Sequence, residues 1–443
     1  MPGRGDSEAV AADTSRMKPE FEVHLDGNRL QGEEKAAIAG VRVYLTHSGA
    51  SAFELVVSDP ELRWQAKPTF TDCKEVKIEL GVPGKMKKVF DGEVTAWRTE
   101  LERAGPTVLV VRGLDRAHRL MRGHKTRTYA QASPIDCAQQ IASAAGLTAK
   151  TSAGKVAPIK TFRIQANESD FHFLRRLADL EGYLFYVEGT ELHFERPTIS
   201  SQDDFTLKFG EDLKTFLPVA NFRRPAAQVE VGAWDSGAKS GLTGVAKPGD
   251  ELWSIPGGQS GGKLAKFQST QPKVGIVDAR ISSQDHADTI AKAALTKRNL
   301  QFLTAEVEVR GNPDIQPGAM VKIEGVGNYS GRYLVTEANH FFDAGGYDCI
   351  FYVASDKFGT PAAQQAAKVQ KQTVAPQDGV VDIKLVDDAG KPIPGERYQV
   401  TLPDGTTLEG TVDDAGRARL EGLPRGNYKV TFPRLSSDAW DKA

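Results

Sequence analysis

The sequence predicts a mainly β protein with an α/β insertion in its middle and a small β domain near its end. Short runs of alternating apolar and polar residues, typical of half-buried strands, extend over residues 21–111 and return over residues 305–353. Between them, two segments have the apolar spacing and capping residues of helices. After residue 355 the composition shifts to Ala, Gln and Lys, and a final group of strands follows.

The chain has 443 residues, enough for three domains of roughly 100–200 residues each. Its composition is that of an ordinary globular protein, and a formal net charge of −2 gives no general attraction to nucleic acid or to a membrane. No apolar run approaches the roughly 20 residues that span a bilayer, and the first residues lack the apolar core of a secretion signal. We therefore expect no nucleic-acid recognition and no stable membrane anchor.

The three cysteines are far apart in the sequence. This spacing favours a reducing compartment over a disulfide framework, and it offers no cluster of zinc ligands. The cysteines are Cys73, Cys137 and Cys349.

The first alternating region predicts six or so strands, with a turn at Pro83-Gly84. That number of short strands indicates a closed or nearly closed barrel. His118 follows the last strand, but no nucleophile or carboxylate lies at a recognisable spacing from it. We therefore interpret His118 as a structural helix residue. The apolar positions are Phe21, Val23 and Leu25; Val41, Val43 and Leu45; Phe53, Leu55 and Val57; Val76, Ile78 and Leu80; Phe90 to Trp97; and Val108 to Val111.

Two helices are predicted within residues 127–198. Ser133 caps the first helix, with Pro134 in its first turn and Asp136 at the third position. Asn167 is predicted to cap the second, answered by Asp170 three residues later. A left-handed glycine and a tight hairpin then follow, at Gly182, Gly189 and Thr190.

Residues 199–355 are predicted to contain strands on both sides of a further helix. The Gly- and Ser-rich residues 236–262 are expected to form a long mobile loop, and Ser283 starts a helix that ends near Asn299. Within the loop, Gly257 to Lys263 imitates a phosphate-binding loop, but Leu264 replaces the required Ser or Thr. The overlapping GQSGG sequence matches the residue pattern of a nucleophile elbow. That motif requires a preceding strand, and none is predicted here.

The last group of strands alternates at Val381, Ile383 and Leu385. Two Asp-Asp-Ala-Gly sequences, at 387–390 and 413–416, are interpreted as turns, because the ligand spacing of a calcium loop is missing. His340 lies among aromatic residues and is interpreted as a packing residue. The sequence thus predicts no catalytic, cofactor-binding or metal-binding residues and no cofactor.

Three stretches resemble the phage late control D family, the baseplate hub proteins of contractile tails, and the related VgrG spikes of type VI secretion. These are residues 167–194 (NESDFHFLRRLADLEGYLFYVEGTELHF), residues 90–123 and residues 311–342. Residues 229–235 resemble the family strand that opens the second barrel. Residues 390–440 resemble carboxypeptidase-regulatory-like or transthyretin-like modules.

The resemblance implies two tail-tube-like β-barrels, one small α/β subdomain and a C-terminal β-sandwich module. The expected parts are a flexible leader (1–18), a first barrel (19–126), the α/β subdomain (127–198), a second barrel (199–355), a linker (356–378) and the β-sandwich (379–434). The implied protein is a structural hub and not an enzyme. Three chains would place six barrels between a sixfold inner tube and a threefold spike.

The implied partners are two further copies of the chain, the inner tube protein, other baseplate subunits and a separate spike or tip protein. The spike is expected to be separate because no short β-helix repeat follows residue 356. The alternatives are a cargo or effector adaptor acting through the C-terminal module, and a cell-wall hydrolase spike. The implied location is the cytoplasm during assembly, and then a phage or phage-like particle delivered to a target cell surface.

Overall fold

The computed structural model describes most of the chain and divides it into two compact units, residues 1–361 and 362–443. The expected leader, except for Lys18, and most of the expected linker lie outside the described residues. In the described part, no helix is long and apolar enough to cross a membrane. The described residues are 18–71, 73–101, 105–152, 160–235, 238–264, 273–277, 281, 283–359, 379–387, 390–402, 407–423 and 428–432.

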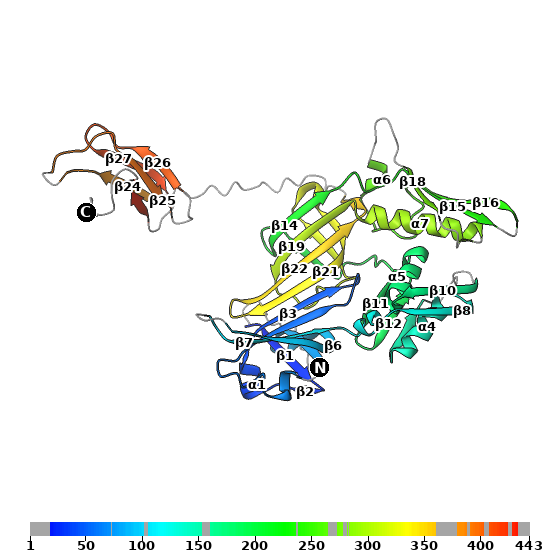
Figure 1. Ribbon diagram of the computed structural model, residues 1–443. Coiled ribbons are helices and arrows are strands. Elements are labelled where there is room, and N and C mark those ends of the chain that lie inside the picture. The colour runs from blue at the N-terminus through cyan, green and yellow to red at the C-terminus, as the bar shows by residue number, and fades with distance from the viewer. Residues whose placement is uncertain are drawn as a thin grey trace, which may run out of the picture. The chain divides into compact units, whose positions relative to one another are not determined.

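The larger unit is built on one sheet of thirteen strands, which confirms the predicted mainly β fold (Figure 1). Alternate side chains of these strands point into a common core, as the sequence periodicity requires. Two short helices, α1 (Gly32–Ala36) and α2 (Pro68–Thr71), lie between strands. The strands are β1 (Glu20–Leu25), β2 (Asn28–Arg29), β3 (Ile38–Thr46), β4 (Ala52–Ser58), β5 (Glu75–Val82), β6 (Lys85–Glu100), β7 (Val108–Leu114), β13 (Phe205–Lys208), β14 (Leu213–Ala220), β19 (Leu303–Arg310), β20 (Met320–Glu324), β21 (Gly331–Asp343) and β22 (Gly346–Ser355).

Strand β21 joins two groups of strands within this sheet. Its first half pairs with β20, and its second half pairs with β3, from Glu337 opposite Thr46 to Phe342 opposite Val41. The first group runs β3-β4-β7-β6-β5-β1-β2, and the second contains β13, β20, β21, β22, β19 and β14. Among the described strands β1 does not pair with β3, so hydrogen bonding between strands leaves the first group open at this point.

An α/β unit follows the first strand group. Two helices pack on a two-stranded and a three-stranded sheet around a core of their own. Ser133 and Asp136 form the predicted reciprocal cap, because each side chain accepts a bond from the other residue's backbone N–H. The elements are α3 (His118–Met121), β8 (Lys125–Ala132), α4 (Pro134–Ala144), β9 (Thr148–Thr151), β10 (Lys160–Glu168), α5 (Asp170–Glu181), β11 (Leu184–Glu188) and β12 (Glu191–Glu195).

The predicted cap of α5 is wrong by two residues. Ser169, not Asn167, precedes the helix in extended conformation and accepts a hydrogen bond from the backbone N–H of His172. Asn167 belongs to β10, with φ +50. At the other end, Gly182 takes the predicted left-handed conformation with φ +69, and a side chain there would meet Leu252 at 2.3 Å. Both residue types are good caps, so the sequence alone did not separate them.

A second helix-on-sheet layer lies within residues 199–355. Helix α7 (Gln284–Leu300), capped by Ser283 as predicted, packs on β16 (Ser240–Ala246), β15 (Gln228–Asp235) and β18 (Lys273–Val277). The prediction that residues 229–235 open the second barrel is therefore wrong, because β13 and β14 enter the large sheet instead.

The predicted mobile loop over residues 236–262 is also wrong, since β16 occupies its first half. The reason is Gly244: a Cβ atom there would lie 2.2 Å from the carbonyl carbon of Ala287. Glycine here allows the strand to lie directly against the backbone of α7, and a glycine chosen for close approach looks like a loop residue in the sequence. In its second half, β17 (Gln259–Ser260) pairs with β23 (Lys357–Phe358), and α6 (Gly261–Leu264) follows.

The smaller unit contains two sheets, β24-β27 and β26-β25-β28, that share one apolar core. The turn interpretation of residues 413–416 is confirmed, because the Asp413 carboxylate accepts hydrogen bonds from the backbone N–H groups of Ala415 and Arg417. Asp387 accepts in the same way from Lys391, whereas residues 388–389 lie outside the described part. The strands are β24 (Gly379–Lys384), β25 (Arg397–Thr401), β26 (Thr407–Thr411), β27 (Arg417–Leu423) and β28 (Lys429–Thr431).

Candidate functional site at the junction of the first strand group and the α/β unit

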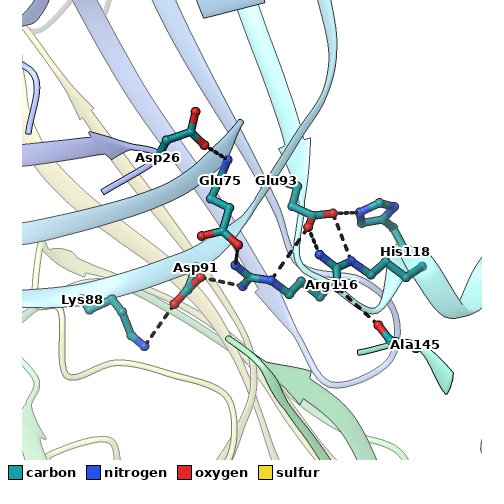
Figure 2. Close-up of polar contacts among 9 residues, drawn as sticks. Asp26, Glu75, Lys88, Asp91, Glu93, Arg116, His118 and Ala145 are labelled. Carbon is teal, nitrogen blue, oxygen red and sulfur yellow. Dashed lines mark hydrogen bonds and ion pairs between the residues drawn. The ribbon is translucent and has the colours of Figure 1, made fainter. Parts of the chain in front are cut away.

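A partly buried charge cluster lies where the chain passes from β7 into the α/β unit (Figure 2). Its centre is Arg116, whose side chain is 3% exposed. Arg116 Nη1 donates to Asp91 Oδ1 at 2.7 Å, and Nη2 donates to Glu75 Oε1 at 3.0 Å. Burial lowers the pKa of Arg116, but the hydrogen bonds with Asp91 and Glu75 outweigh that effect and raise it. Arg116 is therefore a fixed positive charge.

Glu93 forms the second half of the cluster. One oxygen, Oε2, lies 2.7 Å from His118 Nε2, and Arg119 donates to both carboxylate oxygens. Burial raises the pKa of Glu93, but the hydrogen bonds from Arg119 and His118 outweigh it and hold the pKa below its ordinary value. The structure therefore brings to His118 a carboxylate partner that the sequence did not reveal, because Glu93 lies on β6 and His118 begins α3.

The charge cluster connects several secondary-structure elements. Arg119 also donates to the backbone carbonyl of Ala145, at the C-terminal end of α4, at 3.2 Å. This bond satisfies a helix-end carbonyl that has no partner within the helix. The described side-chain contacts of the cluster link carboxylates, guanidinium groups, one ammonium group and one imidazole, and none involves a hydroxyl or thiol that could act as a nucleophile. The cluster thus ties β5, β6, α3 and α4 together.

Three stacked rings form a second contact between the same parts. His47, after β3, stacks on Tyr186 of β11 with ring centroids 3.8 Å apart, and Tyr186 stacks on His193 of β12 at 4.4 Å. Arg175 of α5 donates to the carbonyl oxygens of His47 and Phe185. Burial, followed by the charges of His193 and Arg175, lowers the pKa of His47 to about 4. His47 is consequently neutral in the folded protein near pH 7.

A small pocket of about 100 Å³ lies beside this stack, where the first strand group, the β11-β12 hairpin and the turn at Gln316 and Pro317 meet. Lys88, Asp91 and Asp115 are among its polar lining residues. Burial raises the pKa of Asp115 to about 6. The volume is well below the roughly 300–1,000 Å³ of typical ligand pockets.

Close packing accounts for the glycines in the two motif-like stretches, the phosphate-loop-like residues 257–263 and the elbow-like residues 258–262. A Cβ atom at Gly258 would lie 2.0 Å from the carbonyl oxygen of Phe358, and one at Gly261 would lie 2.1 Å from the ring of Phe302. Gln259 and Ser260 pair with β23, so this backbone does not form a phosphate cradle. Ser260 is followed by a helix of only four residues, and its hydroxyl is buried.

His340 lies in the core, as predicted. Its Nε2 donates to the carbonyl of Ile315 at 3.0 Å, and its Nδ1 accepts from the Tyr347 hydroxyl at 2.9 Å. Burial lowers the pKa of His340 to about 4. Both ring nitrogens are satisfied by these bonds, so the ring has no nitrogen to offer a ligand.

One group of residues missed by sequence reasoning has the composition of a metal site. Glu22, His24 and Glu79 place three potential ligand atoms within 4.8 Å of one another. They lie on β1 and β5, which are far apart in the sequence and adjacent in the sheet. No spacing rule for metal motifs connects them.

The fold of the larger unit is that of phage tail proteins. A 43 kDa tail protein of prophage MuSo2 from Shewanella oneidensis has a TM-score of 0.58 and 14% identity, over 76% of this chain and 98% of the other. A tail protein from Neisseria meningitidis has a TM-score of 0.58 and 16% identity, over 76% and 97%. A type VI secretion component of E. coli has a TM-score of 0.45 and 12% identity, over 90% and 97%.

Sequence comparison gives a family as well. Residues 19–343 match the model of the Alg8 N-terminal domain. The match covers more than half of the chain, which therefore belongs to the Alg8 N-terminal domain family. No curated protein sequence matches the chain.

Proposed function

We propose that this chain is the structural hub of a baseplate in a contractile phage tail or a phage-tail-like injection system. In this role it joins a sixfold inner tube to a threefold spike. The observation that carries the proposal is the pairing of β21 with β3, which fuses two groups of strands into one sheet. The likeness of the fold to a prophage tail protein and to a tail protein from Neisseria meningitidis supports it.

The fused sheet suits a part that must match two symmetries. A chain with two strand groups supplies six such groups when three chains assemble around one axis, while the trimer itself has threefold symmetry. The two strand groups cannot rotate independently, because hydrogen bonds between β21 and β3 and a common apolar core hold one group to the other. Rigid coupling of this kind is what transmission of force through a baseplate requires.

The junction contacts favour a mechanical role over a catalytic one. The carboxylates of the charge cluster are engaged by Arg116, Arg119 and His118, and the adjacent pocket is small. A glycosidase would instead need two free carboxylates facing an open cleft. We therefore assign the cluster the role of fixing the α/β unit on the first strand group.

A second candidate function concerns the smaller unit. It is compact by itself, with its own two-sheet core, and a cargo or effector adaptor needs such a separate module. Deletion of residues 379–443 from the chain should then leave particle assembly intact but remove one cargo protein from the particles. Particles of unchanged protein content would argue against the adaptor role.

The hub proposal is tested by locating the chain in purified particles. We expect three copies per particle at one end of the inner tube, in contact with tube protein, other baseplate subunits and a separate spike protein. Electron microscopy of particles carrying a labelled chain, with mass spectrometry for copy number, measures both. Chain distributed along the tube, or absent from the particles, would refute the proposal. A monomer seen in light scattering without the partners would not, because trimers can form during assembly.

A further inference from the structure

A group of unused metal-ligand atoms lies on the outer face of the first strand group. Glu22 and Glu79 are direct partners in the antiparallel pairing of β1 with β5, and His24 follows on the same face of β1. The intervening residues Val23 and Leu25 point into the core, so the strand fixes which side chains face outward. His24 Nε2 lies 3.8 Å from Glu22 Oε2.

The atoms of this group that face one another, Glu22 Oε2, His24 Nε2 and the Glu79 carboxylate, form no hydrogen bond with other described residues. His24 Nε2 is shielded from solvent and has no hydrogen-bond partner, and the side chain of Glu79 has no described hydrogen bond or ion pair. Arg29 binds Oε1 of Glu22 at 2.5 Å, which leaves Oε2 facing His24. Two carboxylates directly opposite each other in a sheet repel. A cation between them would remove this repulsion.

We propose that Glu22, His24 and Glu79 bind one divalent first-row transition-metal ion, with zinc as the representative ion. An imidazole nitrogen with two carboxylate oxygens suits zinc and its neighbours. Calcium and magnesium, in contrast, take oxygen ligands. The three atoms lie within 4.8 Å of one another, and a tetrahedral site with a water as fourth ligand would require side-chain rotations that bring them closer.

The bound ion would fasten β1 to β5. Strand β1 lies near the end of the sheet, where β5 and the two-residue β2 are the only described strands that pair with it. Arg29 and Lys77, the cross-strand neighbours of His24, place positive charge near the site and weaken binding. We therefore expect exchangeable binding that stabilises the fold, in contrast to the obligatory zinc of a small metal-dependent domain.

The test uses the full chain freed of metal by a chelator. Calorimetric titration with zinc and absorbance titration with cobalt should both give one ion per chain, and zinc should raise the melting temperature. His24→Ala and Glu79→Gln should each weaken zinc binding by about 10- to 100-fold or more, a loss of the size seen when metal sites are altered.

The matched control is His124→Ala, which removes an exposed histidine elsewhere and should leave binding unchanged. Melting curves without metal establish that each variant is folded. Absence of saturable binding at millimolar zinc, or binding that survives both His24→Ala and Glu79→Gln unchanged, would overturn the proposal. Binding that His124→Ala removes would overturn it equally.

Discussion

Replacing Arg116 by Met tests whether the charge cluster fixes the α/β unit. The substitution keeps most of the side-chain volume but leaves Asp91 and Glu75 without their guanidinium partner. Removing one member of a buried ion pair costs about 3–5 kcal/mol. Lys88, 3.6 Å from Asp91, and the exposure of Glu75 reduce the expected loss to about 2–3 kcal/mol.

Scanning calorimetry of the full chain measures this loss. At about 2 °C per kcal/mol for a large unit, the transition of the larger unit should fall by about 4–6 °C. The control is Arg98→Ala, which removes an exposed ion pair with Glu100 and should change stability by less than about 1 kcal/mol.

A double variant sharpens the test. Asp91→Asn removes the charge that Arg116→Met leaves unpaired, so the double variant should be more stable than the sum of the two single losses predicts. Equal melting temperatures for Arg116→Met and Arg98→Ala would refute the proposal that the charge cluster fixes the α/β unit on the first strand group. Strict additivity in the double variant would refute it as well.

Three further predictions concern His47, Gly244 and the smaller unit. The pKa of His47 is about 4 when folded and 6.5 ordinarily, so the folded state binds fewer protons between these values. Its stabilising contribution is complete above pH 6.5 and is lost as pH falls through about 4, so His47→Phe should flatten the decline of melting temperature over this range. Gly244→Ala should destabilise the larger unit by about 1–3 kcal/mol through collision with Ala287, whereas Gly241→Ala, with open space around it, should be near neutral; equal melting temperatures would contradict this. The isolated residues 376–443 should unfold cooperatively on heating, and a disordered circular dichroism spectrum would show that the module depends on the rest of the chain or a partner.

Local patterns in the sequence determined most of the elements. Alternation placed β1, β3, β4 and β5, because residues that share one face of a strand must share one environment. The cap at Ser133 and the left-handed glycine at Gly182 could also be predicted from the sequence, because they depend only on neighbours within a few residues.

Only the tertiary structure decided which distant segments meet. Pairing of β21 with β3, the contact of Gly244 with α7, and the meeting of Arg116 with Asp91 and Glu75 join residues that no local period connects. The Glu22–Glu79 pair is of the same kind, because strand register is set by the whole sheet. Strands and caps follow from short-range sterics and hydrogen bonds, whereas sites follow from long-range packing, which the linear order of residues does not contain.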